Sequence, residues 1–131
     1  MSDESVFVFL ALVRALNEGD LEALLELTLA DVVLRPLAPC LRGEYRGHDG
    51  VRALWADRER GCEAVQLHHR HVRGDLGDRV LALGTLRIRH RDGVVTDQAS
   101  ASVAVFKDGK LARWDGFASQ QRALEAVGLS E

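Results

Sequence analysis

Apolar residues recur at helical spacing through the first half of the chain. Residues 3–18 predict one helix, and residues 21–28 predict a second directly after Gly19 and the capping residue Asp20. The connection between them is so short that the two helices should form a hairpin. Residues 50–60 predict a third helix with its apolar positions on one face.

From residue 64 the pattern changes to the two-residue alternation of β-strands. Strands are predicted over residues 64–73, 79–91, 98–106 and 111–118, after a short strand over 32–35 and before a last helix over 120–127. Helices followed by an antiparallel meander are typical of the α+β class. We therefore expect a single domain over residues 1–131. Its cone-shaped, curved antiparallel sheet should wrap around the three N-terminal helices, with a short C-terminal helix after it.

The last hairpin sets the predicted register of the sheet. Asp108-Gly109 between two apolar runs is a strong turn signal, and a bulged turn at Gly109 would pair Trp114 with Ser102. Small residues beside one tryptophan leave open volume, which predicts a ligand pocket. The alternative is that they only make room for the third helix and its Trp55. The face in question carries Gln98, Ser100, Ser102, Ala104, Trp114 and Gly116.

Composition narrows the classes of partner. The 131 residues are 47% hydrophobic and 28% charged, which is ordinary for a globular domain. The net charge of −3, with acids and bases interspersed, predicts no nucleic-acid partner. The longest apolar run, residues 6–13, is too short to span a membrane and lacks the flanks of a signal peptide. Cys40 and Cys62 are too few for a disulfide framework, so we expect reduced thiols in a cytoplasmic protein.

Few side chains suggest a particular chemistry. His69 and His71 share one face of a regular strand and could hold a metal, but a third ligand is not evident, so we expect no metal and no other cofactor. His48 and Asp97 could each act as a general base. Their positions in a loop and at a strand start favour turn or cap roles instead.

Three segments together resemble the nuclear transport factor two-like superfamily, and within it the SnoaL-like and ketosteroid isomerase-like branch. They are residues 17–24, residues 45–51, and the hairpin from Asp108 with the helix after it. The resemblance covers nearly the whole chain and implies the cone-shaped fold. It does not imply one activity, because the superfamily includes ketosteroid isomerase, limonene epoxide hydrolase, scytalone dehydratase, polyketide cyclases and binding proteins without chemistry.

The catalytic positions that this resemblance implies carry the wrong residues. The isomerase tyrosine falls on Leu12, its catalytic carboxylate on Arg35, and its second acid near Ser100. An arginine does not lose its proton in a protein and cannot be that base. The aspartate of the epoxide hydrolases falls on Gly116, and their Arg/Asp pair falls near Gly84 and Leu86.

We therefore expect a protein that binds a small hydrophobic ligand in an apolar pocket. Two interpretations of its activity stay open: an isomerase-, cyclase- or hydrolase-like enzyme acting on a polyketide- or steroid-like carbonyl compound, and a binding or dimerisation module without catalysis. For Arg35, a surface ion pair with Glu44 is the alternative to a place in the pocket. The predicted ligand-binding residues are Arg35, Trp55, Leu86, Gln98, Ser100, Ser102 and Trp114.

The outer face of the predicted sheet also carries apolar side chains. The resemblance implies a homodimer, and sheet-to-sheet packing would cover such a patch. The apolar positions concerned are Leu81, Leu83, Val103 and Val105.

Overall fold

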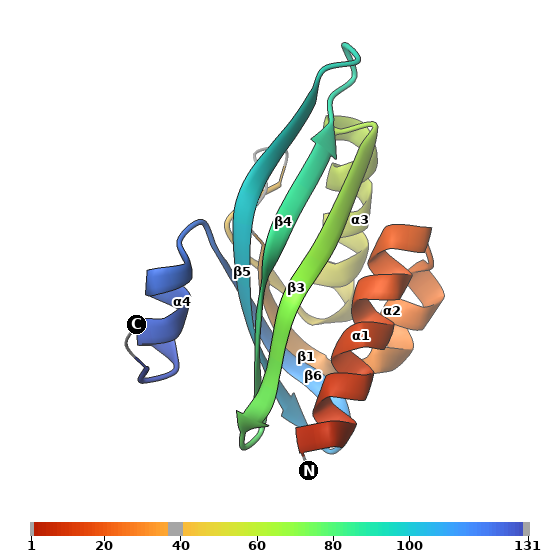
Figure 1. The fold of residues 1–131 in the computed structure, drawn as a ribbon. Helices are drawn as coiled ribbons and strands as arrows, with labels where there is room; N and C mark the ends of the chain where they lie inside the picture. The colour runs from red at the N-terminus through yellow and green to blue at the C-terminus, as the bar shows by residue number, and fades with distance from the viewer. Residues whose placement is uncertain (1, 37–40, 130–131) are drawn as a thin grey trace.

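The computed structural model describes residues 2–36 and 41–129, which form four helices and a curved six-stranded sheet (Figure 1). This arrangement confirms the predicted α+β class and the cone shape. The elements in chain order are α1 (Ser2–Glu18), α2 (Leu21–Leu27), β1 (Thr28–Arg35), β2 (Tyr45–Arg46), α3 (Gly47–Gly61), β3 (Ala64–Leu76), β4 (Arg79–Arg89), β5 (Val95–Lys107), β6 (Lys110–Phe117) and α4 (Gln120–Ala126).

The strands lie in the order β2-β1-β6-β5-β4-β3, and β1 runs parallel to β6. The sheet is therefore mixed, where the sequence predicted antiparallel pairs alone. No hairpin joins β1 to β6, so the turn chemistry that fixes the direction of the later strands does not act on β1. β1 also begins at Thr28, whose extended backbone ends α2 and whose Oγ1 donates a hydrogen bond of 2.9 Å to the free Leu24 carbonyl at that helix end.

The three N-terminal helices and α4 lie on opposite sides of the sheet (Figure 1). On the concave side Phe9 of α1 stacks on Trp114 of β6, with ring centroids 5.0 Å apart. On the convex side Ala123 and Val127 of α4 pack against the sheet in a second, smaller cluster. Both faces of the central strands are therefore partly covered within one chain.

The α4 helix changes the prediction for the outer face. Leu81 and Val103 are only 1% and 6% exposed, because α4 packs on them. Of the four apolar positions predicted to cover a dimer surface, Leu83 and Val105 alone are half-buried rather than buried. The apolar area left for a second copy of the chain is thus smaller than the sequence suggested.

A bulge in β6 corrects the predicted register without changing the faces. Asp108 and Gly109 both have positive φ, 55° and 76°, and form a two-residue turn that pairs Lys107 with Lys110. The pairing shifts after Leu111, so that Trp114 faces Ala104 rather than Ser102. The error is two residues, and an even shift leaves every side chain on its predicted side.

A second bulge separates the two histidines of β3. His69 pairs with Gly84 and His71 pairs with Leu83, so Arg70 is left over between them. His69 lies against Phe9 on the concave side, with ring centroids 5.2 Å apart, whereas His71 is exposed. The prediction that both imidazoles share a face is wrong, because the extra residue reverses the alternation.

Cys62 is buried, at 3% exposure, and disulfide-bonded, so the prediction of a reduced thiol is wrong for this residue. Two cysteines are too few for several disulfide bonds, but they are enough for one. Cys40 lies outside the described residues. Within the described ranges, no helix has the length and apolar character needed to cross a membrane.

The bulge in β3 predicts that Gly84 tolerates no side chain. A Cβ atom at this position would lie 1.9 Å from the His68 carbonyl oxygen and 2.7 Å from the His69 Cα. Both are backbone atoms of a paired strand and cannot move aside as a flexible side chain can. Gly84→Ala should lower the free energy of unfolding by about 3 kcal/mol or more.

Urea denaturation measures this difference, with Gly43→Ala as the control. Apart from its two chain neighbours, no atom of the described residues lies within 4 Å of the Cβ position at Gly43. The control should keep the wild-type midpoint, and an unchanged midpoint for Gly84→Ala would contradict the close approach.

Candidate ligand-binding cavity

A cavity of about 100 Å³ lies between the first three helices and the concave face of the sheet. Its wall is mostly apolar, with contributions from α1, α2, α3 and the strands. A cavity with such a lining suits a small hydrophobic molecule. The polar side chains that reach the wall are Asn17, Thr28, Arg58, Ser100 and Ser102.

Four of the residues predicted to bind a ligand lie in this wall. Leu86 comes from β4, Ser100 and Ser102 from β5, and Trp114 from β6. They meet because each lies at the alternate positions of its strand that face inward. Their part in binding stays a prediction.

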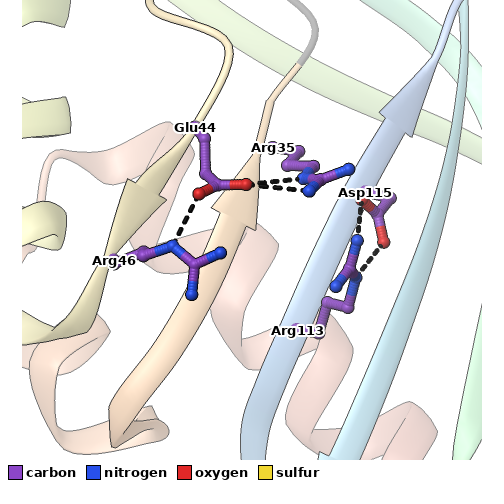
Figure 2. A network of polar contacts seen from close by, with 5 residues as sticks. All are labelled: Arg35, Glu44, Arg46, Arg113 and Asp115. Carbon is purple, nitrogen blue, oxygen red and sulfur yellow. Dashed lines mark hydrogen bonds and ion pairs between the residues drawn. The ribbon is translucent and has the colours of Figure 1, made fainter.

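Arg35 does not reach the cavity. Leu34 and Pro36 line the wall on either side of it, so the alternation of β1 directs Arg35 to the opposite face. There its guanidinium lies 2.9 Å from Glu44, which also contacts Arg46 (Figure 2). Arg46 and Arg35 together lower the pKa of the Glu44 carboxyl. The surface ion pair is therefore the alternative that holds for Arg35.

Trp55 and Gln98 also lie outside the wall. Trp55 is 9% exposed and belongs to the core between the helices and the sheet, where its ring carries the Arg58 guanidinium at 4.7 Å. Gln98 pairs with Leu86 and is half-buried. Its inward-facing position on β5 places it before the stretch of the strand that borders the cavity.

Two of the polar groups in the wall are already occupied within the fold. The Asn17 amide donates to the Leu67 carbonyl and accepts from the Leu67 amide, both at 3.0 Å. The Thr28 hydroxyl donates to the Leu24 carbonyl. These groups fix the end of α1 on β3 and the end of α2, so we assign them to the architecture.

The Ser100 and Ser102 hydroxyls are not occupied. The residues are 6% and 2% exposed, and neither hydroxyl hydrogen-bonds with another residue in the described part of the chain. Neither oxygen is among the buried polar atoms that lack a partner, so both reach the open space of the cavity and are available to a ligand there.

Arg58 is a wall residue that the sequence analysis missed. It follows Val51 by seven residues and Leu54 by four, so the helical period already places it on the inner face of α3. Its Nη2 donates to the Leu16 carbonyl at 3.3 Å and to the Val65 carbonyl at 3.1 Å. Burial lowers the pKa of its guanidinium, which nevertheless stays charged at any ordinary pH.

The described wall contains no carboxylate and no imidazole. Leu12 and Gly116, the positions that resemble catalytic ones, do line the cavity but carry no polar side chain. Of the two suggested bases, His48 Nε2 lies 3.0 Å from the Thr28 carbonyl oxygen. Asp97 forms two hydrogen bonds with Arg87, at 2.8 and 3.0 Å, which lower its pKa. Neither residue is among those that line the cavity.

Residues 9–114 match the model of the SnoaL-like domain. Among solved structures, TerC co-crystallized with polyporic acid is 22% identical over 95% of this chain and 98% of that chain, with a TM-score of 0.78. Rv0760c from Mycobacterium tuberculosis, in complex with estradiol-17beta-hemisuccinate, is 13% identical over 89% and 95%, with a TM-score of 0.76. IdmH from Streptomyces antibioticus, provisionally assigned as a polyketide cyclase, is 20% identical over 94% and 96%, with a TM-score of 0.71.

At these identities the likeness to the three structures shows the fold alone. A search of curated proteins finds no match. The chemistry of this chain therefore has to be argued from its own cavity.

His69 should make the protein less stable in mildly acidic solution. Burial lowers its pKa from 6.5 to about 4, and its Nε2 has no hydrogen-bond partner in the described part of the chain. Below pH 6.5 the unfolded chain therefore binds a proton that the folded protein does not bind until about pH 4. The free energy of unfolding should fall across this window by up to about 3 kcal/mol.

Denaturant titrations at a series of pH values measure the effect. The decrease attributable to His69 should disappear in His69→Leu and persist in His71→Leu, which removes an exposed histidine from the same strand. Parallel curves for the wild type and His69→Leu would show that the imidazole is not protected from protonation.

Proposed function

The chain belongs to the SnoaL-like domain family. We propose that its cavity binds a small hydrophobic ligand and contacts an oxygen atom of that ligand. The observation that carries the proposal is the pair of unpartnered hydroxyls of Ser100 and Ser102 in an otherwise apolar wall. A carbonyl oxygen can accept from both hydroxyls. The indole of Trp114 offers a flat apolar surface beside them.

The class of ligand that we propose is a polyketide- or steroid-like carbonyl compound. The apolar lining and the small number of polar groups support a mostly apolar molecule. The neighbouring folds include one crystallised with an estradiol derivative and one with polyporic acid. They support the class of ligand and leave its identity open.

The composition of the wall favours binding over proton-transfer chemistry. A general base must lie within hydrogen-bond reach of the proton that it takes, and the polar side chains of the described wall are those of serine, threonine, asparagine and arginine, with the indole N–H of tryptophan. We therefore place a non-catalytic binding role ahead of an isomerase-, cyclase- or hydrolase-like activity. An enzyme of this kind would have to orient and polarise a carbonyl without a carboxylate or imidazole from these residues.

Removal of one hydroxyl should weaken binding of a neutral ketone. Ser102→Ala deletes a hydrogen-bond donor and little volume, so the dissociation constant for benzophenone should rise about tenfold. Isothermal titration calorimetry measures it. Thr85→Val, which removes a hydroxyl from the outer-face position paired with Ala99, is the control and should bind as the wild type does.

An equal affinity of Ser102→Ala and the wild type would exclude the hydroxyl from the contact. No heat of binding from any of several aromatic and steroid ketones would contradict the proposed ligand class.

We also propose that two copies of the chain associate through the convex face of the sheet. What supports this is the half-buried pair Leu83 and Val105 beside the part that α4 covers. Multi-angle light scattering at micromolar concentration should give twice the mass of the chain for the wild type. Val105→Glu should give the mass of one chain, and Phe7→Glu, at a 74% exposed position on α1, should not change the association. A wild-type protein with the mass of one chain would refute the dimer.

A further inference from the structure

We infer that the ligand of this cavity is a hydrophobic monoanion whose negatively charged oxygen is held by Arg58. The inference rests on the proposed function, because it names the charge of the molecule that the cavity takes. The observations behind it are the charge of Arg58, its hydrogen-bond partners and its position in the cavity wall.

Arg58 carries the sole charge in the described wall of the cavity. The leucine and valine side chains around it give a cation no compensation, so its partners in the fold are two backbone carbonyls and the Trp55 ring. A charge surrounded by apolar groups is costly unless an opposite charge or a set of hydrogen bonds compensates it. The question is therefore what balances the guanidinium.

Within the described part of the chain no carboxylate forms an ion pair with Arg58, although the charge of the neighbouring Glu59 raises the pKa of its guanidinium against the effect of burial. The other arginines of α3, Arg52 and Arg60, form ion pairs with Asp49 and Asp57. Asp57, although adjacent to Arg58 in sequence, also accepts hydrogen bonds from Arg42 at 2.8 Å and from the Tyr45 hydroxyl at 2.7 Å. Consecutive residues of a helix point about 100° apart, so the Asp57 carboxylate faces these partners rather than the cavity.

The contacts that Arg58 does make hold its guanidinium in place. One terminal nitrogen, Nη2, donates to the carbonyls of Leu16 and Val65, and the Trp55 ring lies 4.7 Å from the guanidinium carbon. The Nε and Nη1 groups have no partner in the described residues. An arginine with a fixed plane and free N–H groups is well suited to a carboxylate, which accepts two parallel hydrogen bonds.

A purely structural role would need less than Arg58 provides. Joining the last turn of α1 to β3 uses one nitrogen of the side chain, and a neutral amide could make the same contacts. The structural role therefore accounts for Nη2. Arg58 is half-buried, and Nε and Nη1 are not among the buried atoms without a partner, so they reach open space where an anion can meet them.

The resulting ligand has two different polar ends. One end is an ionised oxygen, as in a carboxylate or an ionised enol, and it lies at Arg58. The other end is a neutral oxygen that meets Ser100 and Ser102, with an apolar body between them. A single cation in an apolar wall favours one negative charge and disfavours a polyphosphate or a sugar phosphate.

Two probes of the same shape test the charge requirement. We would titrate 2-naphthoate and 2-naphthamide into the wild type and into Arg58→Met and Arg52→Met by isothermal calorimetry. Arg58→Met keeps an apolar stem against Trp55 and removes the charge. Arg52→Met makes the same change in net charge at an exposed position of the same helix.

The wild type and Arg52→Met should bind the naphthoate at least tenfold more tightly than the naphthamide. Arg58→Met should bind both probes with equal affinity, and its affinity for the naphthamide should stay within about twofold of the wild-type value. Should Arg58→Met fail to fold, Arg58→Lys keeps the charge and should retain a reduced preference for the acid.

Equal affinity of the wild type for the two probes would overturn the inference and leave the proposed function standing. A preference for the acid that persists in a folded Arg58→Met protein would also overturn it. Failure of the wild type to bind either probe or the ketones would refute the proposed function, and the inference with it.

Discussion

The stacked rings of Phe9 and Trp114 connect the two ends of the chain. Phe9 is fully buried on the first helix, and Trp114 lies on the last strand, with an interplanar angle of 14°. Together with the hydrogen bonds between Asn17 and Leu67, this contact holds α1 over the concave face of the sheet. The cavity exists because the stack fills one part of the space under the helices, while the small side chains of Ser100, Ser102 and Gly116 leave another part open.

The spacing of the apolar residues and the residues of the last turn predict most of this architecture. The change from helical to alternating spacing near residue 64 marks the boundary between helices and meander, and Asp108-Gly109 identifies the closing hairpin. The inward faces of β4, β5 and β6 were also predictable, because the error in register was even. Four residues of the cavity wall could therefore be predicted, because a shift of two residues keeps each side chain on its predicted face.

The remaining features depend on single residues that no local pattern reveals. One unpaired residue, Arg70, sends His69 and His71 to opposite faces, and nothing in the sequence around it marks a bulge. Arg35 was placed inward by analogy, whereas its neighbours Leu34 and Pro36 take the inward positions. The helical spacing of α3 already places Arg58 on the inner face of the helix. A charged residue at such a position is normally expected to turn toward solvent, so its place in the cavity wall was not predicted.

The residues that stabilise the helix ends differ from those at the apolar positions of the cavity, and this separation affects how the cavity could gain new chemistry. Asn17 and Thr28 hold helix ends through hydrogen bonds, whereas Leu12 and Gly116 reach the cavity without a polar side chain. The groups that maintain the scaffold are thus separate from the two positions that the resemblance to the isomerases and epoxide hydrolases marks as catalytic. Leu12 is also a core residue at 1% exposure, and Gly116 pairs with Ser102. A phenol at Leu12 would keep every helix cap but would have to displace neighbouring core side chains, so a gain of chemistry at this position carries a cost in packing.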